Sequence, residues 1–153
     1  MRLAEAFATK TVEEIEAALA GGKLVLYSTG RPPLADHAVT RSSVLAELTF
    51  SSPAFADGAP AFVENPVVAK HVGTPGWARA STADGATVAD FSVGPGYGEI
   101  KLNDAAATPN FPLGVASIAI TLPAENVEWA KSEFGHVYVT NSDNPYRKLS
   151  VRG

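Results

Sequence analysis

The chain has 153 residues, the length of one ordinary domain, so a two-domain enzyme with a separate cofactor domain is not expected. It has no cysteine, which excludes disulfide scaffolds, thiolate metal sites and thiol nucleophiles. Only 18% of its residues are charged and its formal net charge is −4, which argues against a nucleic-acid partner because phosphate binding needs clustered Lys and Arg. No export signal or membrane span is predicted, because Glu5 interrupts the start and prolines interrupt the uncharged stretch 105–124.

One short helix is predicted near the N-terminus. Thr11 and Glu14 have the spacing of a capping box, in which two side chains satisfy backbone amides at the start of a helix. The apolar side chains that then repeat at helical spacing are Val12, Ile15 and Leu19. Gly21-Gly22 supplies a left-handed end. Because the apolar stripe is narrow, we expect the helix to lie on a sheet or against a neighbouring subunit.

Strands are predicted from Lys23 onward, where the apolar period changes to two and β-formers dominate. The predicted strands are 23–28, 44–50, 61–71, 76–82, 87–93, 99–102, 115–122, 135–140 and 146–151. Asp84-Gly85 predicts a tight hairpin between two of them, because glycine readily adopts the positive φ that such a turn requires. Long loops are predicted at 31–43, 51–60 and 103–114.

The predicted fold class is all-β, an antiparallel β-sandwich of which a jelly roll is one form, with one short N-terminal helix. Many short strands, a single helix and no alternation of strands with helices lead to this class. We expect an N-terminal arm and helix at 1–22, a β-sandwich core at 23–123, and a C-terminal extension at 124–153 that packs on the core or on a neighbour.

The residues that could carry catalysis do not form a recognisable set. Asp36-His37 lies near Ser42, but sequence neighbours seldom form a triad and no Gly-x-Ser-x-Gly elbow is present. The three histidines lack ligand spacing, and the glycine-rich loop 94–98 lacks the Lys-Ser/Thr of a phosphate loop. No catalytic residue, cofactor or metal site is therefore predicted.

Contact with a partner is the role expected of several apolar and aromatic side chains. Trp77 and Arg79 share a strand face, where they could stack on a sugar or hold a neighbouring subunit, and packing of Trp77 under the Arg79 stem is the structural alternative. The side chains predicted to bind a partner are Val12, Ile15, Leu19, Trp77, Arg79, Trp129 and Tyr146.

Several stretches together resemble a known family, the small virion structural proteins of tailed bacteriophages. They are KLVLYSTGRPP (23–33) with VLAELTFSSPAF (44–55), WARASTADG (77–85) with TVADFSVG (87–94), and ASIAITL (116–122). They are similar to the opening, the central hairpin and the closing strand of that family, and the resemblance covers about residues 23–122. It brings no catalytic or ligand residue.

What the resemblance implies is a capsid cement or decoration protein, made in the host cytoplasm and located on the capsid surface. Its expected partners are the major capsid protein and copies of itself in a homo-oligomer, with no nucleic acid and no membrane. We expect the contact elements before Lys23 and after Pro123. Two other readings stay open: a tail or head–tail connector protein, and a carbohydrate-binding module with Trp77 or Tyr97 exposed in a shallow groove. An enzyme comes last.

Overall fold

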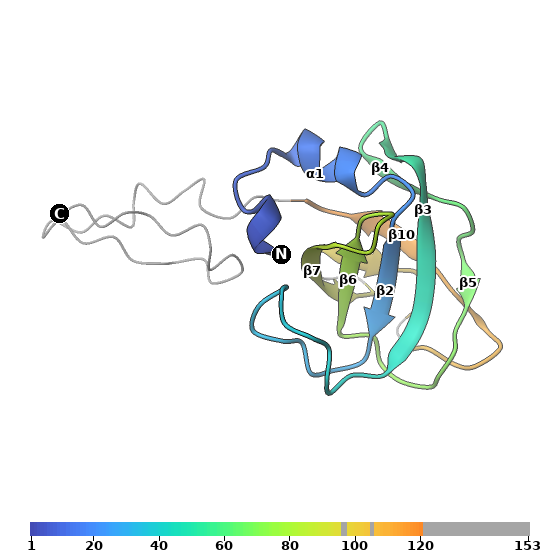
Figure 1. The fold of residues 1–153 in the computed structure, drawn as a ribbon. Coiled ribbons are helices and arrows are strands. Elements are labelled where there is room, and N and C mark those ends of the chain that lie inside the picture. The colour runs from blue at the N-terminus through green and yellow to red at the C-terminus, as the bar shows by residue number, and fades with distance from the viewer. Residues whose placement is uncertain (96–97, 105, 121–153) are drawn as a thin grey trace, which may run out of the picture.

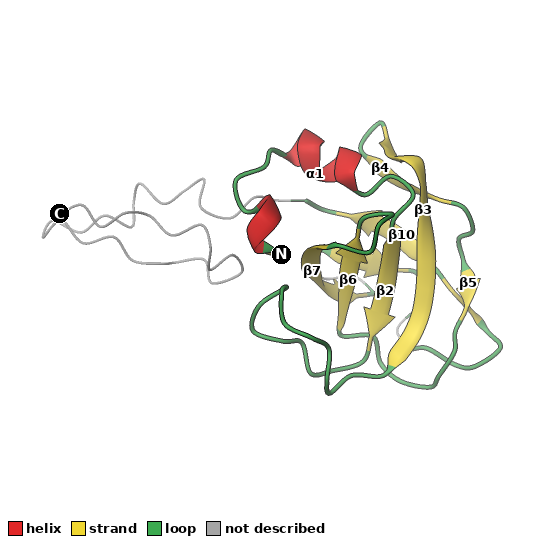
Figure 2. Ribbon diagram, viewed as in Figure 1, coloured by secondary structure: helices red, strands yellow, loops and turns green. Residues whose placement is uncertain are grey.

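The computed structural model describes residues 1–95, 98–104 and 106–120. The helical elements are the 3₁₀ helix η1 (Glu5–Phe7) and the helix α1 (Val12–Ala18). The strands are β1 (Arg2–Leu3), β2 (Lys23–Tyr27), β3 (Val44–Ala56), β4 (Ala59–Phe62), β5 (Val67–Val68), β6 (Trp77–Ser81), β7 (Thr87–Gly94), β8 (Ile100–Leu102), β9 (Pro112–Leu113) and β10 (Val115–Ile118). Figures 1 and 2 show α1 at the end of the sheet where β2 begins.

The fold is all-β and mostly antiparallel, as predicted. Seven strands pair in the order β10-β8-β7-β6-β2-β3-β4, and β1 joins this sheet by pairing with β7. The β7–β8 pairing is parallel, whereas the other pairings in the sheet are antiparallel. The sheet curls until β10 lies beside β4, which makes a nearly closed barrel. The two sheets expected of a sandwich are therefore opposite sides of one curled sheet. The strands β5 and β9 pair with each other outside this sheet.

The seam between β4 and β10 is bridged by one side chain. Asn65 donates from Nδ2 to the Val115 carbonyl at 2.9 Å, and the Val115 amide donates to Asn65 Oδ1 at 3.0 Å. The amide group of Asn65 thus takes the place of a neighbouring strand at the start of β10. Gly114 permits this approach, because a Cβ there would lie 3.0 Å from Asn65 Oδ1 and 2.8 Å from Asn103 Nδ2.

The core lies inside the barrel and follows from the alternation of side chains along each strand. In β2, Leu24 and Leu26 are fully buried, whereas Val25 and Tyr27 between and after them are half-buried. The larger core side chains include Phe50, Phe91, Met1, Leu3, Ile15, Leu19, Leu45, Leu48 and Ile100. Because burying a side chain of this size contributes about 1.5–3 kcal/mol, these residues supply the main driving force for the fold.

The helix α1 is confirmed, together with its cap. The Glu14 amide donates to Thr11 Oγ1 at 3.2 Å, and the Thr11 amide donates to Glu14 Oε1 at 3.0 Å, which completes the capping box. Ile15 and Leu19 are fully buried in the core, and Val12 is half-buried. The predicted partner contact is therefore wrong for Ile15 and Leu19, because the chain's own core covers them.

Residues 1–22 belong to the barrel and do not form a separate arm. β1 pairs with β7, the Met1 residue is 2% exposed, and the N-terminal ammonium forms an ion pair with Glu99. Residues 1–22 are therefore not separated from the core at the predicted boundary, since they share the same core, and the predicted contact role of this segment stays a prediction. The C-terminal extension 124–153 lies outside the described residues, as does the predicted contact element after Pro123.

The predicted loop at 51–60 is mostly strand. β3 continues to Ala56, and the chain then turns within two residues, Asp57-Gly58, before β4 begins. Both turn residues have positive φ angles, 53° and 80°, which suits the strand twist of a two-residue hairpin. The Asp-Gly signal that identified the other hairpin is thus also present here.

The predicted strand 61–71 is divided into β4 and β5, with Asn65-Pro66 between them. Proline has no amide to donate to a strand ladder, which explains the interruption. The Asp84-Gly85 hairpin between β6 and β7 is confirmed, and Gly85 has the expected positive φ of 90°. The predicted strands 135–140 and 146–151 lie outside the described residues.

Candidate functional site

The loop between β2 and β3, residues 28–43, covers part of the outer face of β2, β6 and β7. Its ends are held together, because the Ser28 amide donates to the Ser43 carbonyl and the Ser43 amide to Ser28 Oγ, each at 3.2 Å. Figure 1 shows this loop at the end of β2, away from α1. Long irregular segments whose ends meet are Ω-loops, which are frequently functional. We name residues 28–43 the pinned loop, because side chains of the barrel hold it to the sheet.

Trp77 lies beneath the pinned loop and is 1% exposed. Its ring stacks on Tyr27 with centroids 4.4 Å apart, and the Arg79 guanidinium lies 5.5 Å from its centroid. Its Nε1 donates to Ser42 Oγ at 2.9 Å and to the Thr29 carbonyl at 3.3 Å, both in the loop. The predictions that Trp77 binds a subunit or an exposed sugar are therefore wrong, and packing beside Arg79 is what the structure contains.

Arg79 forms a buried ion pair with Asp90 of β7. Arg79 Nε donates to Asp90 Oδ1 at 2.7 Å and Nη2 to Oδ2 at 3.0 Å, and Asp90 is 0% exposed. Burial raises the pKa of Asp90, while the hydrogen bonds and charge of Arg79 and the charges of Arg31 and Arg2 oppose this rise. The predicted partner-binding role of Arg79 is not compatible with this geometry, because its charge is already matched inside the fold.

All four arginines within the described residues lie at the pinned loop: Arg2, Arg31, Arg41 and Arg79. Arg2 Nη1 donates to the Pro32 carbonyl at 2.8 Å. Arg79 Nη1 donates to the His37 carbonyl at 2.7 Å. In the reverse direction, Arg31 Nη2 of the loop donates to the backbone carbonyl of β7 at 3.1 Å. Charged donors bind carbonyls more strongly than neutral ones do, so the loop has a fixed shape despite its lack of regular structure.

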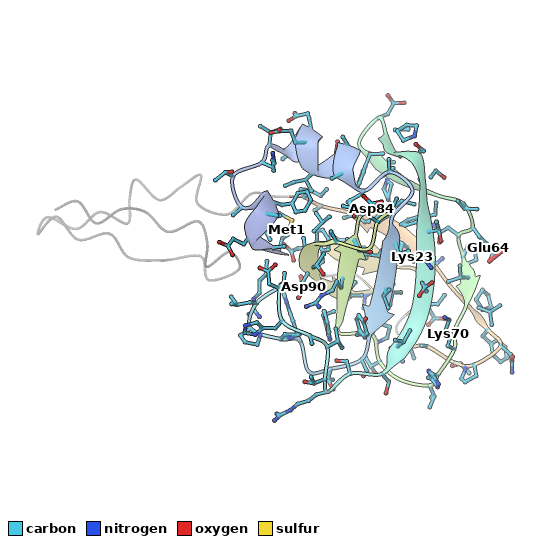
Figure 3. The ribbon with its side chains drawn as sticks, in the orientation of Figure 1. Met1, Lys23, Glu64, Lys70, Asp84 and Asp90 are labelled. Carbon is cyan, nitrogen blue, oxygen red and sulfur yellow. The ribbon has the colours of Figure 1, made fainter. Side chains whose placement is uncertain are left out.

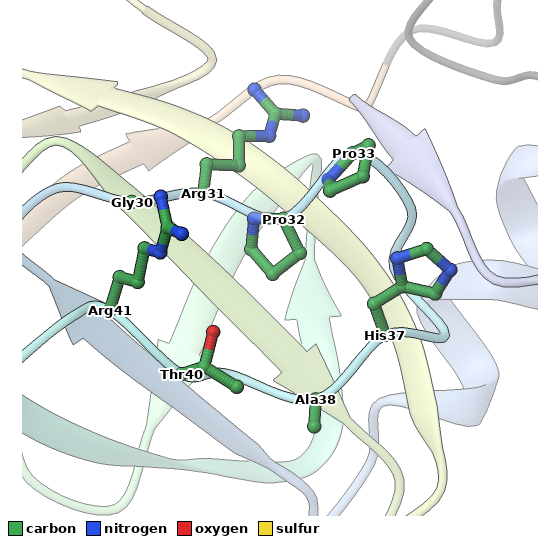
Figure 4. A pocket seen from close by; sticks show the side chains of 8 residues that line it. All are labelled: Gly30, Arg31, Pro32, Pro33, His37, Ala38, Thr40 and Arg41. Carbon is green, nitrogen blue, oxygen red and sulfur yellow. The ribbon is translucent and has the colours of Figure 1, made fainter.

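The pinned loop surrounds a solvent-open hollow of about 500 Å³, and Figure 4 shows the side chains that line it. Its lining consists of residues 30–33, 37, 38, 40 and 41. Two guanidinium groups (Arg31 and Arg41), one imidazole (His37) and one hydroxyl (Thr40) are among the lining groups, and no carboxylate is. The volume lies in the usual range for small-ligand sites.

The Asp-His-Ser arrangement considered for hydrolysis is not brought together. Asp36 Oδ2 accepts a hydrogen bond from the Glu5 amide at 2.9 Å, and Ser42 Oγ accepts from the indole of Trp77. The carbonyl of His37 is bound by Arg79. Each of these groups is thus used to fasten the loop.

Four large apolar side chains are exposed in the described part of the chain, and the pairing of β5 with β9 brings two of them, Val68 and Phe111, near each other. We name them the apolar strip: Val63 (74% exposed), Val68 (56%), Val72 (75%) and Phe111 (62%). Val68 is paired with Pro112 across the two strands, and the Ala69 amide donates to the Phe111 carbonyl at 3.1 Å. Glu64 and Lys70 lie beside it at the β5 edge of the molecule (Figure 3). Val68 and Phe111 are thus presented on hydrogen-bonded backbone.

The two surfaces were not identified from the sequence as sites. Val63 and Val68 fall in a predicted strand, Phe111 in a predicted loop and Val72 between two predicted strands, and only the break at Asn65-Pro66 could have indicated that some of them face outward. The arginines of the pinned loop carry no local pattern, because their targets are backbone carbonyls far away in the chain. Two predicted partner-binding residues, Trp129 and Tyr146, lie outside the described residues.

No group of three or more metal-binding side chains is assembled within residues 1–95, 98–104 and 106–120. His71 Nδ1 instead donates to the Val44 carbonyl at 2.7 Å. In the same part of the chain, no helix has the length and apolar character needed to cross a membrane.

Comparison with known proteins adds no family to these geometric findings. No family model matches the chain, and no match was found among curated proteins or among solved structures.

Proposed function

We propose that the protein is a phage virion structural protein of the cement or decoration type, which binds major capsid subunits on the capsid surface. The resemblance of residues 23–122 to small tailed-phage virion proteins suggests this role. The observation that carries the proposal is the apolar strip, four large apolar side chains that are 56–75% exposed, of which Val68 lies in β5 and Phe111 directly precedes its partner β9. Exposed apolar groups gathered in one region are typical of protein-binding surfaces.

The strip has the properties that attachment to a repeated lattice requires. Each of its side chains contributes at most about 1.5–3 kcal/mol when buried, so a single contact of this size is weak. A symmetric oligomer that presents several copies would convert these weak contacts into strong retention on a shell. We therefore propose that the protein acts as a homo-oligomer, with one strip per subunit facing the shell.

The test is retention on shells that lack the protein. Phe111→Ser and Val72→Ser change side chains that are already exposed, so the fold should be preserved. Because each substitution removes about 1.5–3 kcal/mol of burial at every contact, retention in co-sedimentation should fall at least about tenfold. Ala83→Ser, in the exposed β6–β7 turn, is the matched control and should bind like the wild type. Undiminished retention of both strip variants would reject the proposal.

A tail or head–tail connector protein is the alternative within the same class. The copy number in purified particles separates the two, because a decoration protein scales with the number of capsid subunits and a connector forms a single ring or a few. Quantitative mass spectrometry against the major capsid protein measures this ratio directly.

A further inference from the structure

We propose that the hollow of the pinned loop is a binding site for a small oxyanion of the phosphate or carboxylate class. The hollow combines Arg31, Arg41, His37 and Thr40 around one solvent-open space of about 500 Å³. Guanidinium groups bind oxyanions through paired N–H donors, and a hydroxyl adds a further donor. This inference goes beyond shell binding and does not depend on it.

The charge distribution supports an anionic ligand. The chain carries 16 acidic and 12 basic residues, yet the lining contains two arginines and no carboxylate. Within residues 1–95, 98–104 and 106–120, Asp90 is paired with Arg79, and Asp36 of the loop accepts the Glu5 amide, so both carboxylates are already used. Arg31 already donates to the Asp90 carbonyl and acts on the Asp90 charge, so Arg41 is the positive group of the lining that is directed to a ligand.

Arg41 is the guanidinium best placed to meet a ligand. Its residue is exposed, and its side chain forms no hydrogen bond or ion pair with any other part of the chain that the structure describes. Figure 4 shows Arg41 and Thr40 directed from one limb of the loop toward the opposite limb at Gly30 and Arg31. An oxyanion between the limbs would therefore receive donors from Arg41 without breaking an existing contact.

The site is also organised before any ligand arrives. At the mouth, Gly30 has a φ of 81°, and a Cβ on it would lie 2.8 Å from the Arg41 carbonyl oxygen, so the two limbs are in close contact. Farther along, guanidinium groups hold the carbonyls of Pro32 and His37. Because the loop is already ordered, ligand binding does not carry the cost of ordering it.

The experiment is a titration of the full-length protein with inorganic phosphate and, separately, with citrate, both at constant ionic strength adjusted with chloride. Isothermal calorimetry and the midpoint of thermal unfolding are the measurements. We expect saturable binding of at least one anion, with a rise in unfolding temperature that follows its occupancy. Arg41→Gln should weaken this binding by about tenfold or more, because it removes a charged donor pair. Lys101→Gln, which removes an exposed positive charge on β8, should bind like the wild type.

The outcomes separate the sources of the ligand and the two proposals. Binding of phosphate alone assigns a phosphate ligand, binding of citrate alone a carboxylate, and binding of both a general oxyanion site. No saturable response to either anion overturns the inference, and so does a response that Arg41→Gln retains in full. Phe111→Ser should bind the anion normally, so that failure on shells and failure of anion binding remain distinguishable.

Discussion

Replacing Arg79 by methionine tests whether the buried ion pair is a main link between the barrel and its loop. The Asp90 carboxylate is 0% exposed and receives two hydrogen bonds from Arg79, at 2.7 and 3.0 Å. In Arg79→Met this carboxylate stays buried without its bidentate partner, and the His37 carbonyl loses its donor. Removing one partner of a buried pair costs about 3–5 kcal/mol, and we expect the free energy of unfolding at pH 7 to fall by that amount.

The loss should depend on pH in a defined direction. Burial raises the pKa of Asp90, and the hydrogen bonds and charge of Arg79 oppose this. Because the folded-state pKa lies above the unfolded value, the contribution of this group to stability is full below the unfolded pKa and declines as the pH rises through the folded pKa. Without Arg79 the pKa rises further, so the deficit of Arg79→Met should shrink as the pH falls and Asp90 becomes protonated.

Urea unfolding followed by tryptophan fluorescence at pH 7 and at about pH 5 measures both effects. The Arg79 guanidinium lies 5.5 Å from the centroid of the Trp77 ring, so the emission of Trp77 reports on the region that the substitution changes. Lys101→Met removes an exposed positive charge elsewhere and should shift stability by less than about 0.5 kcal/mol. An unfolding midpoint of Arg79→Met equal to that of the wild type would refute the reasoning, as would a deficit that is the same at both pH values.

Three further substitutions test the N-terminal cap of α1, the close contact of Gly22 with Ser81, and the Asn65 bridge between β4 and β10. Thr11→Ala removes the helix cap and should lower stability by about 1 kcal/mol, measured by thermal unfolding. Gly22→Ala would place a Cβ 1.9 Å from the Ser81 carbonyl oxygen, so it should destabilise more than Thr11→Ala or abolish soluble expression. Asn65→Ala removes two hydrogen bonds to Val115 and should cost about 1–3 kcal/mol, with faster hydrogen exchange of the Val115 amide.

Each of these predictions has a result that would contradict it. Thr11→Ser keeps the hydroxyl, so equal melting of Thr11→Ser and Thr11→Ala would show that the cap contributes nothing. A Gly22→Ala protein that is soluble and melts like the wild type would show that the α1–β2 junction can move freely. Unchanged exchange of the Val115 amide in Asn65→Ala would mean that another group closes the seam.

The helix cap and the β6–β7 hairpin could be predicted because each is formed by a few residues that are neighbours in the sequence. The Thr11–Glu14 box and the Asp84-Gly85 hairpin depend only on spacing and on the conformational freedom of glycine, and both are confirmed. The Asp57-Gly58 turn carries the same signal, but the preceding Ser-Ser-Pro suggested a loop and hid it. The all-β class follows from the same local periodicities.

Which faces of the strands are buried could not be predicted, because burial depends on contacts between residues that are far apart in the sequence. Alternation places Trp77 on the outer side of its strand, and the pattern alone would leave it exposed. It is buried because Thr29 and Ser42, which are 48 and 35 residues away in sequence, fold over it. Conversely, Val68 lies in an apolar run that suggested a buried strand, and it is exposed because β5 lies outside the barrel.

The hydrogen bonds that hold the pinned loop to the barrel also set the order in which the chain folds. During synthesis, residues 28–43 leave the ribosome well before Arg79, whose guanidinium later binds a carbonyl 42 positions earlier in the chain. The loop therefore cannot reach its final shape until β6 and β7 have been made and docked. In nascent or partly unfolded chains the hydrogen bond from Arg79 to the loop is absent, so only a finished barrel displays the arginine-lined surface.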